Sequence, residues 1–97
     1  MRLAERLKQH IIRSVLASFG DVDIYLFGSR VDDAKRGGDI DIAIDVELST
    51  EQFKHHKIQF ISSLIRVGLD LKIDIVPYNS EDKLLRDEIH RSALKLN

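Results

Sequence analysis

The sequence lacks cysteine and tryptophan, and it contains a single proline. Without cysteine, the chain forms neither a disulfide framework nor a zinc site built on thiolates. The sequence also lacks a secretory signal pattern and any apolar run of the length that spans a bilayer. We therefore expect a cytoplasmic protein that does not associate with a membrane.

The chain also lacks an excess of charge of either sign, because its 15 basic and 16 acidic residues give a formal net charge of -1. A strongly basic balance is the usual electrostatic signature of a protein that grips nucleic acid, so we expect no direct nucleic-acid binding. At 97 residues the chain has enough material for one hydrophobic core. We expect a single domain over residues 1–97.

The most informative stretch is the alternation of aspartate with apolar residues over residues 39–45. Alternate side chains of a strand point to opposite faces, so Asp39, Asp41 and Asp45 share one face and the isoleucines share the other. Neighbouring carboxylates repel each other unless a cation lies between them. Mg²⁺ binds one or two carboxylates together with water and phosphate oxygens. The pair Asp39-x-Asp41 therefore predicts a site for metal and phosphate, with Asp45 as a solvated strand end.

Residues that suit phosphate binding come shortly before this strand. Gly28 lets the backbone approach a phosphate closely, and Ser29 offers a hydroxyl and backbone N–H groups. Arg30 adds a charge-assisted contact. A second alternating strand, over residues 71–76, carries Asp74, which is the expected third carboxylate of the site.

Hydrophobic spacing divides the chain into alternating helices and strands. We expect helices over residues 3–19, over residues 50–67 after a capping box at Ser49, and from about Glu81 to Leu96, and strands over residues 24–27, 39–46 and 71–76. The link between the first two strands is too short for a crossover helix, so these strands should be antiparallel. The predicted fold is α/β (α+β), with a small mixed sheet whose isoleucine face carries most of the helices.

Each of these features also has a plain structural explanation. An isolated Asp-x-Asp occurs on many solvated strands, and Lys72 could simply form a salt bridge with Asp74. The adjacent His55 and His56 point about 100° apart on a helix, so we expect surface side chains rather than one metal site. The combination of the aspartates with Gly28 and Ser29 is what favours a nucleotide site.

The chain resembles the minimal nucleotidyltransferase (MNT) family of the DNA polymerase β superfamily in four features: the run Phe27-Gly28-Ser29-Arg30, the turn Arg36-Gly37-Gly38, the pair Asp39-x-Asp41 and the later strand with Asp74. The resemblance covers nearly the whole chain and implies a polymerase-β-like core. It implies that Gly28 and Ser29 bind the phosphates of a nucleotide. It further implies two Mg²⁺ ions held by Asp39 and Asp41, with Asp74 completing one metal site and helping to activate the attacking hydroxyl.

Stand-alone members of this family are commonly encoded beside a HEPN-domain protein, and many such pairs are toxin-antitoxin systems. The resemblance therefore implies an antitoxin that transfers AMP from ATP to a hydroxyl of a HEPN ribonuclease toxin, with tyrosine as the expected acceptor, in a hetero-oligomer. The link at residues 30–38 is shorter than in AMPylating antitoxins, a departure that bears on tyrosine AMPylation more than on the fold. Two alternatives remain open. One is a non-catalytic module that neutralises its HEPN partner by binding alone. The other is nucleotidyl transfer to a small hydroxyl compound.

Overall fold

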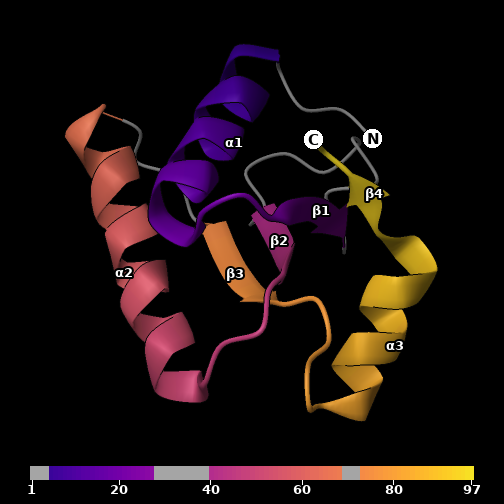
Figure 1. Cartoon of the computed structure of the whole chain (residues 1–97). Coiled ribbons are helices and arrows are strands. Elements are labelled where there is room, and N and C mark those ends of the chain that lie inside the picture. Colours follow the sequence, from indigo (N-terminus) through magenta and orange to yellow (C-terminus); the bar gives the residue numbers. More distant parts are fainter. Residues whose placement is uncertain (1–4, 28–39, 69–72) are drawn as a thin grey trace.

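The computed structural model describes residues 5–27, 40–68 and 73–97. Within them lie α1 (Glu5–Phe19), β1 (Asp23–Phe27), β2 (Ile40–Asp45), α2 (Thr50–Arg66), β3 (Ile73–Pro77), α3 (Lys83–Ser92) and β4 (Leu94–Lys95). The four strands form one sheet in the order β3-β2-β1-β4. In Figure 1, α1 and α2 lie together on one side of the sheet and α3 lies apart from them. This arrangement confirms the predicted mixed α/β fold.

The sheet is mixed because β2 pairs antiparallel with β1 on one side and parallel with β3 on the other. β1 and β2 are antiparallel, as the short link between them predicts, with Phe27 opposite Asp41. β2 and β3 are parallel, and α2 is the crossover between them. No helix among the described residues is both long and apolar enough to cross a membrane.

The two faces of the sheet build two hydrophobic clusters of unequal size. The larger cluster packs the isoleucine face against α1 and α2, with Ile42, Ile44 and Phe60 fully buried. The smaller cluster, on the opposite face, joins Ala43 of β2 to Ile89 of α3. Two of the three described helices therefore cover the isoleucine face, as predicted, while α3 covers part of the face that carries the aspartates.

α2 starts at the predicted capping box. The Ser49 hydroxyl accepts a hydrogen bond from the Gln52 backbone N–H at 3.1 Å, and the Gln52 side chain accepts one from the Ser49 N–H at 3.2 Å. The structure buries only some of the apolar side chains of this helix. Only Phe53, Phe60 and Leu64 are buried, whereas four other apolar side chains remain between 38% and 65% exposed, namely Ile58, Ile61, Ile65 and Val67.

The prediction of one helix from about Glu81 to Leu96 is wrong at its C-terminal end. α3 ends at Ser92, Ala93 is extended, and the chain continues as β4. β4 pairs antiparallel with β1, and the Leu96 N–H donates to the Ile24 carbonyl at 2.8 Å. The physical reason is that β1 has a second edge, whose backbone groups need partners that a longer helix would not supply. Leu96 is buried by this pairing and not by a helical stripe.

Candidate active site

Two of the three predicted carboxylates lie on neighbouring strands at the same level. Asp41 of β2 and Asp74 of β3 are register partners in the parallel pair. Both share a face with Ala43 and Val76, which belong to the smaller cluster, so both side chains project from the face opposite the isoleucines. Neighbouring strands lie about 4.8 Å apart. The structure therefore brings together two acidic side chains that are far apart in sequence.

The two aspartates differ in exposure and in their surroundings. Asp41 is half-buried, whereas the Asp74 side chain is 57% exposed. Lys57 of α2 forms an ion pair with Asp74, with 3.3 Å between Nζ and Oδ1. Because α2 covers the isoleucine face and Asp74 projects from the other, the long lysine side chain reaches past the edge strand β3. The sequence did not identify Lys57 as a site residue. The available signal is its position between Phe53 and Phe60, at the spacing of the buried face of α2.

The remaining predicted site residues lie outside the described residues: Gly28, Ser29, Arg30 and Asp39, together with Lys72. Their predicted roles stay predictions. Phe27, which directly precedes Gly28 in sequence, is the register partner of Asp41.

Aromatic rings occupy the same face of the sheet, further from the Asp41–Asp74 pair. Tyr25 of β1 stacks on Tyr78, with 4.3 Å between ring centroids, and Tyr78 lies 4.6 Å from the His90 ring of α3. Burial raises the pKa of the Tyr25 hydroxyl above its ordinary value of 10.0, and the neighbouring Asp23 carboxylate adds to the rise. This side of the face is thus filled by rings and α3, while Asp74 remains exposed.

Asp45 lies at the far end of β2, as predicted. It is exposed and opposite Asp23 of β1, and Asp23 in turn pairs with Lys95 of β4 at 3.3 Å. The strand alternation places Asp45 on the same face as Asp41, but four residues along the strand. Asp45 is therefore not a neighbour of Asp74.

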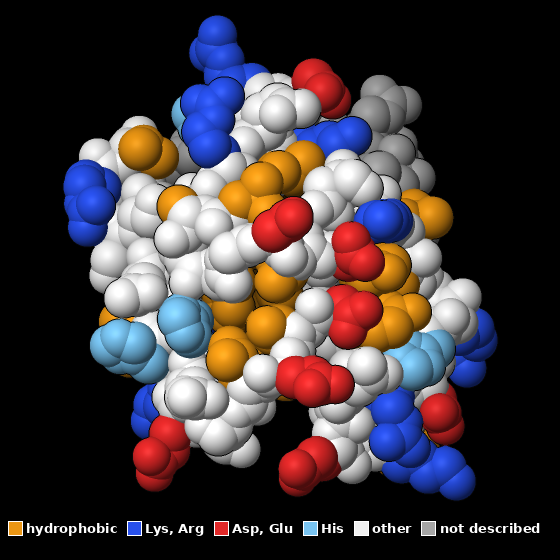
Figure 2. Space-filling model, viewed as in Figure 1, with side chains coloured by type: hydrophobic (Ala, Val, Ile, Leu, Met, Phe, Trp, Pro, Cys, Tyr) orange, Lys and Arg blue, Asp and Glu red, His pale blue; other side chains and the backbone are white. Residues whose placement is uncertain are grey.

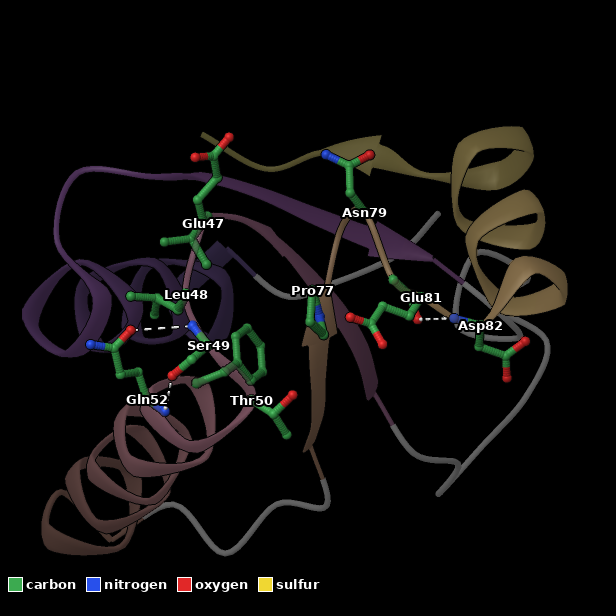
Figure 3. Close-up of a pocket in the computed structure, with 12 residues that line it drawn as sticks. Glu47, Leu48, Ser49, Thr50, Gln52, Pro77, Asn79, Glu81 and Asp82 are labelled. Atoms are coloured by element: carbon green, nitrogen blue, oxygen red, sulfur yellow. Dashed lines mark hydrogen bonds between the residues drawn. The ribbon is translucent and has the colours of Figure 1, made fainter.

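A hollow of about 670 Å³ lies at the opposite ends of β2 and β3 from the aspartate pair. It lies between the start of α2 and the loop before α3 (Figure 3), and the lower edge of the surface in Figure 2 is indented there between acidic side chains. Its lining includes Glu47, Glu81 and Asp82 and no basic residue. Three carboxylates without a cation disfavour phosphate, so this hollow does not suit the phosphates of a nucleotide.

The Asp41–Asp74 pair has the chemistry that a divalent metal ion requires. Hard cations take one or two carboxylates from the protein and fill the other positions with water and substrate phosphates. Among residues 5–27, 40–68 and 73–97, no group of three or more His, Asp or Glu side chains is placed to hold a metal ion. The described chain thus contributes two carboxylates to the candidate site, and Asp39 is the third that the sequence predicts.

Comparison with known proteins gives a family and a shared fold. Residues 9–96 match the model of the family described as "Polymerase beta, Nucleotidyltransferase". A solved structure described as "Crystal structure of the toxin-antitoxin with AMP-PNP" contains a chain similar to this one, with a TM-score of 0.69 and 24% sequence identity. The match covers 93% of this chain and 72% of that chain. A search of curated proteins finds no match. At this identity the structural likeness shows that the two chains share a fold.

Proposed function

Because the chain belongs to the polymerase beta nucleotidyltransferase family, we propose that it transfers a nucleotidyl group from a nucleoside triphosphate to a hydroxyl acceptor at the Asp41–Asp74 pair. The observation that carries this proposal is the register of Asp41 with Asp74 on one face of the parallel pair β2–β3. A shared register holds two carboxylates at the separation at which they can act on one substrate. Asp39 joins them as the third acidic group.

The reaction is an in-line displacement at the α-phosphorus. The acceptor oxygen forms a bond to the α-phosphorus, and the bond from that phosphorus to the bridging oxygen breaks to release pyrophosphate. Asp74 accepts the proton of the acceptor hydroxyl. Its side chain is exposed, so an acceptor can reach its carboxylate. Gly28 and Ser29 hold the leaving pyrophosphate, with Arg30 beside them. Asp39, Asp41 and Asp74 would hold two Mg²⁺ ions, which would supply charge stabilisation of the entering and leaving oxygens.

We further propose that the protein is an antitoxin that uses ATP to place AMP on a tyrosine hydroxyl of a HEPN-domain ribonuclease toxin, within a hetero-oligomer. Two features of the similar solved structure support this: its description names a toxin-antitoxin, and AMP-PNP is an analogue of ATP. The described surface supports a protein partner as well. Three isoleucines of α2, Ile58, Ile61 and Ile65, recur at helical spacing and are 38% to 65% exposed.

The experiment is to incubate the purified protein with ATP labelled at the α-phosphate, Mg²⁺ and the product of the adjacent open reading frame. Covalent label on a tyrosine of that product is the expected result, and Asp41→Asn should remove it. Stable co-purification without label would favour the second candidate, a module that neutralises its partner by binding alone. In a parallel reaction that also contains a small hydroxyl compound, label on that compound and none on protein would favour transfer to a small molecule.

A further inference from the structure

We propose that Lys57 is a positioning residue of the candidate site: its ammonium group is a counter-ion of Asp74 in the metal-free protein and is displaced when a divalent cation binds. This inference rests on the proposed function, because it takes Asp74 as a metal ligand. It concerns a side chain of α2, an element that contributes no predicted site residue. Neither the motifs nor the family match singles out this lysine.

The contact itself is the first argument. Lys57 Nζ lies 3.3 Å from Asp74 Oδ1, and the two side chains come from different elements. Lys57 is 33% exposed, so its aliphatic stem is largely packed while its charged end reaches the carboxylate. It lies four residues after Phe53 and three before Phe60, both of which are buried. These two anchors fix the face of α2 that Lys57 occupies and therefore the direction of its side chain.

The second argument is the charge that this contact balances. Asp41 and Asp74 project from the same face at the same level of two adjacent strands, and two carboxylates so placed raise each other's electrostatic energy. A cation at Asp74 relieves this repulsion. Lys57 supplies a positive charge from within the chain, and this charge stabilises the two neighbouring carboxylates in the absence of metal.

The consequence is competition for one oxygen. Mg²⁺ binds carboxylate oxygens at about 2.0–2.1 Å, and an ammonium group 3.3 Å from Oδ1 would lie close to such an ion. Two positive charges at one carboxylate repel each other, so metal binding at Asp74 is disfavoured while Lys57 stays in place and favoured when Lys57 moves away. Lys57 thereby lowers the affinity of the free protein for metal. The negative charge of bound nucleotide phosphates would offset this effect and couple metal binding to nucleotide binding.

The test measures Mn²⁺ binding to the purified protein alone, by electron paramagnetic resonance of the free ion at physiological ionic strength. An exposed ion pair has a small interaction energy, so Lys57→Met should tighten Mn²⁺ binding by about two- to fivefold. Lys57→Arg keeps the charge and should bind as the wild type does. The matched control is Lys54→Met, which removes a charge from an exposed position of the same helix and should leave affinity unchanged, because charges further away are screened.

A double-mutant cycle with Asp74→Asn separates this role from a general effect of charge. In the Asp74→Asn background, Lys57→Met should no longer change Mn²⁺ affinity. The inference is overturned if Lys57→Met binds Mn²⁺ no more tightly than the wild type, if neither protein binds it, or if the gain persists without Asp74. Nucleotide transfer is measured separately: a gain in Mn²⁺ affinity in a protein that transfers no nucleotide would keep this inference and refute the proposed function.

Discussion

Asp41 of β2 and Asp74 of β3 are register partners in the parallel strand pair, and they project side by side from one face of the sheet. Their register is set by the opposite side of the sheet, where Ile40 pairs with Ile73 and Ile42 with Ile75 in the larger cluster. A slip of one residue would turn Asp74 into that core and expose the isoleucines. The hydrophobic face thus holds the acidic face in place, and the same packing that stabilises the domain brings the two carboxylates together.

Asp74→Asn should lower the rate of nucleotidyl transfer by at least about 100-fold and change AMP-PNP affinity far less, because it removes the group that accepts the proton. Single-turnover rates and calorimetric titration with AMP-PNP separate the two effects. Asp45→Asn is the matched control, since Asp45 is an exposed aspartate on the same face at the far end of β2. Equal losses in both variants would refute the assignment of Asp74.

Phe60→Ala should reduce the free energy of unfolding by about 3–5 kcal/mol, because Phe60 is fully buried between α2 and the sheet and its truncation leaves a cavity. Ile65→Ala, on the same helix, should change it by less than about 0.5 kcal/mol, since Ile65 is 65% exposed. Urea denaturation followed by circular dichroism measures both. A large loss for Ile65→Ala in the isolated protein would mean that the exposed isoleucines are already covered.

Asn97→Ala should destabilise the domain by about 1–2 kcal/mol. The Asn97 side chain accepts a hydrogen bond from the Ile24 N–H at 2.9 Å and donates one to the Val22 carbonyl at 2.8 Å, which extends the pairing of β4 with β1. Lys95→Met, which breaks only the exposed ion pair to Asp23, should cost less than about 1 kcal/mol. Thermal unfolding of the two variants in parallel tests the difference, and the reverse order would contradict it.

Tyr25 should titrate above 10.0, because burial disfavours its phenolate. Tyr25 and Tyr78 are the only two tyrosines of the chain, so an ultraviolet absorbance titration of Tyr78→Phe reports on Tyr25 alone. A pKa that is raised in the folded state gives stability that is present below pH 10 and is lost as the pH rises through the folded value. The free energy of unfolding of Tyr25→Phe should therefore fall less than that of the wild type as the pH rises above 10. A pKa at or below 10.0 in the folded protein would contradict this account.

Local patterns predicted much of the fold. The capping box at Ser49, the antiparallel pairing of β1 with β2 and the exposure of Asp45 follow from residues close together in sequence. The predictions failed where distant segments compete. Leu94 and Leu96 continue a helical spacing, but the unpaired edge of β1 draws them into a strand, and backbone pairing across the chain leaves no sign in a local window.

By itself, the sequence determined which residues can carry the chemistry: the alternation of aspartate with isoleucine allots one face of a strand to carboxylates and the other to the core. Only the tertiary structure decided how Asp41 and Asp74 are aligned, and that Lys57 of α2 pairs with Asp74. The physical reason is that side-chain direction depends on backbone periodicity, whereas register and ion pairing depend on how a helix and two strands pack across a shared core.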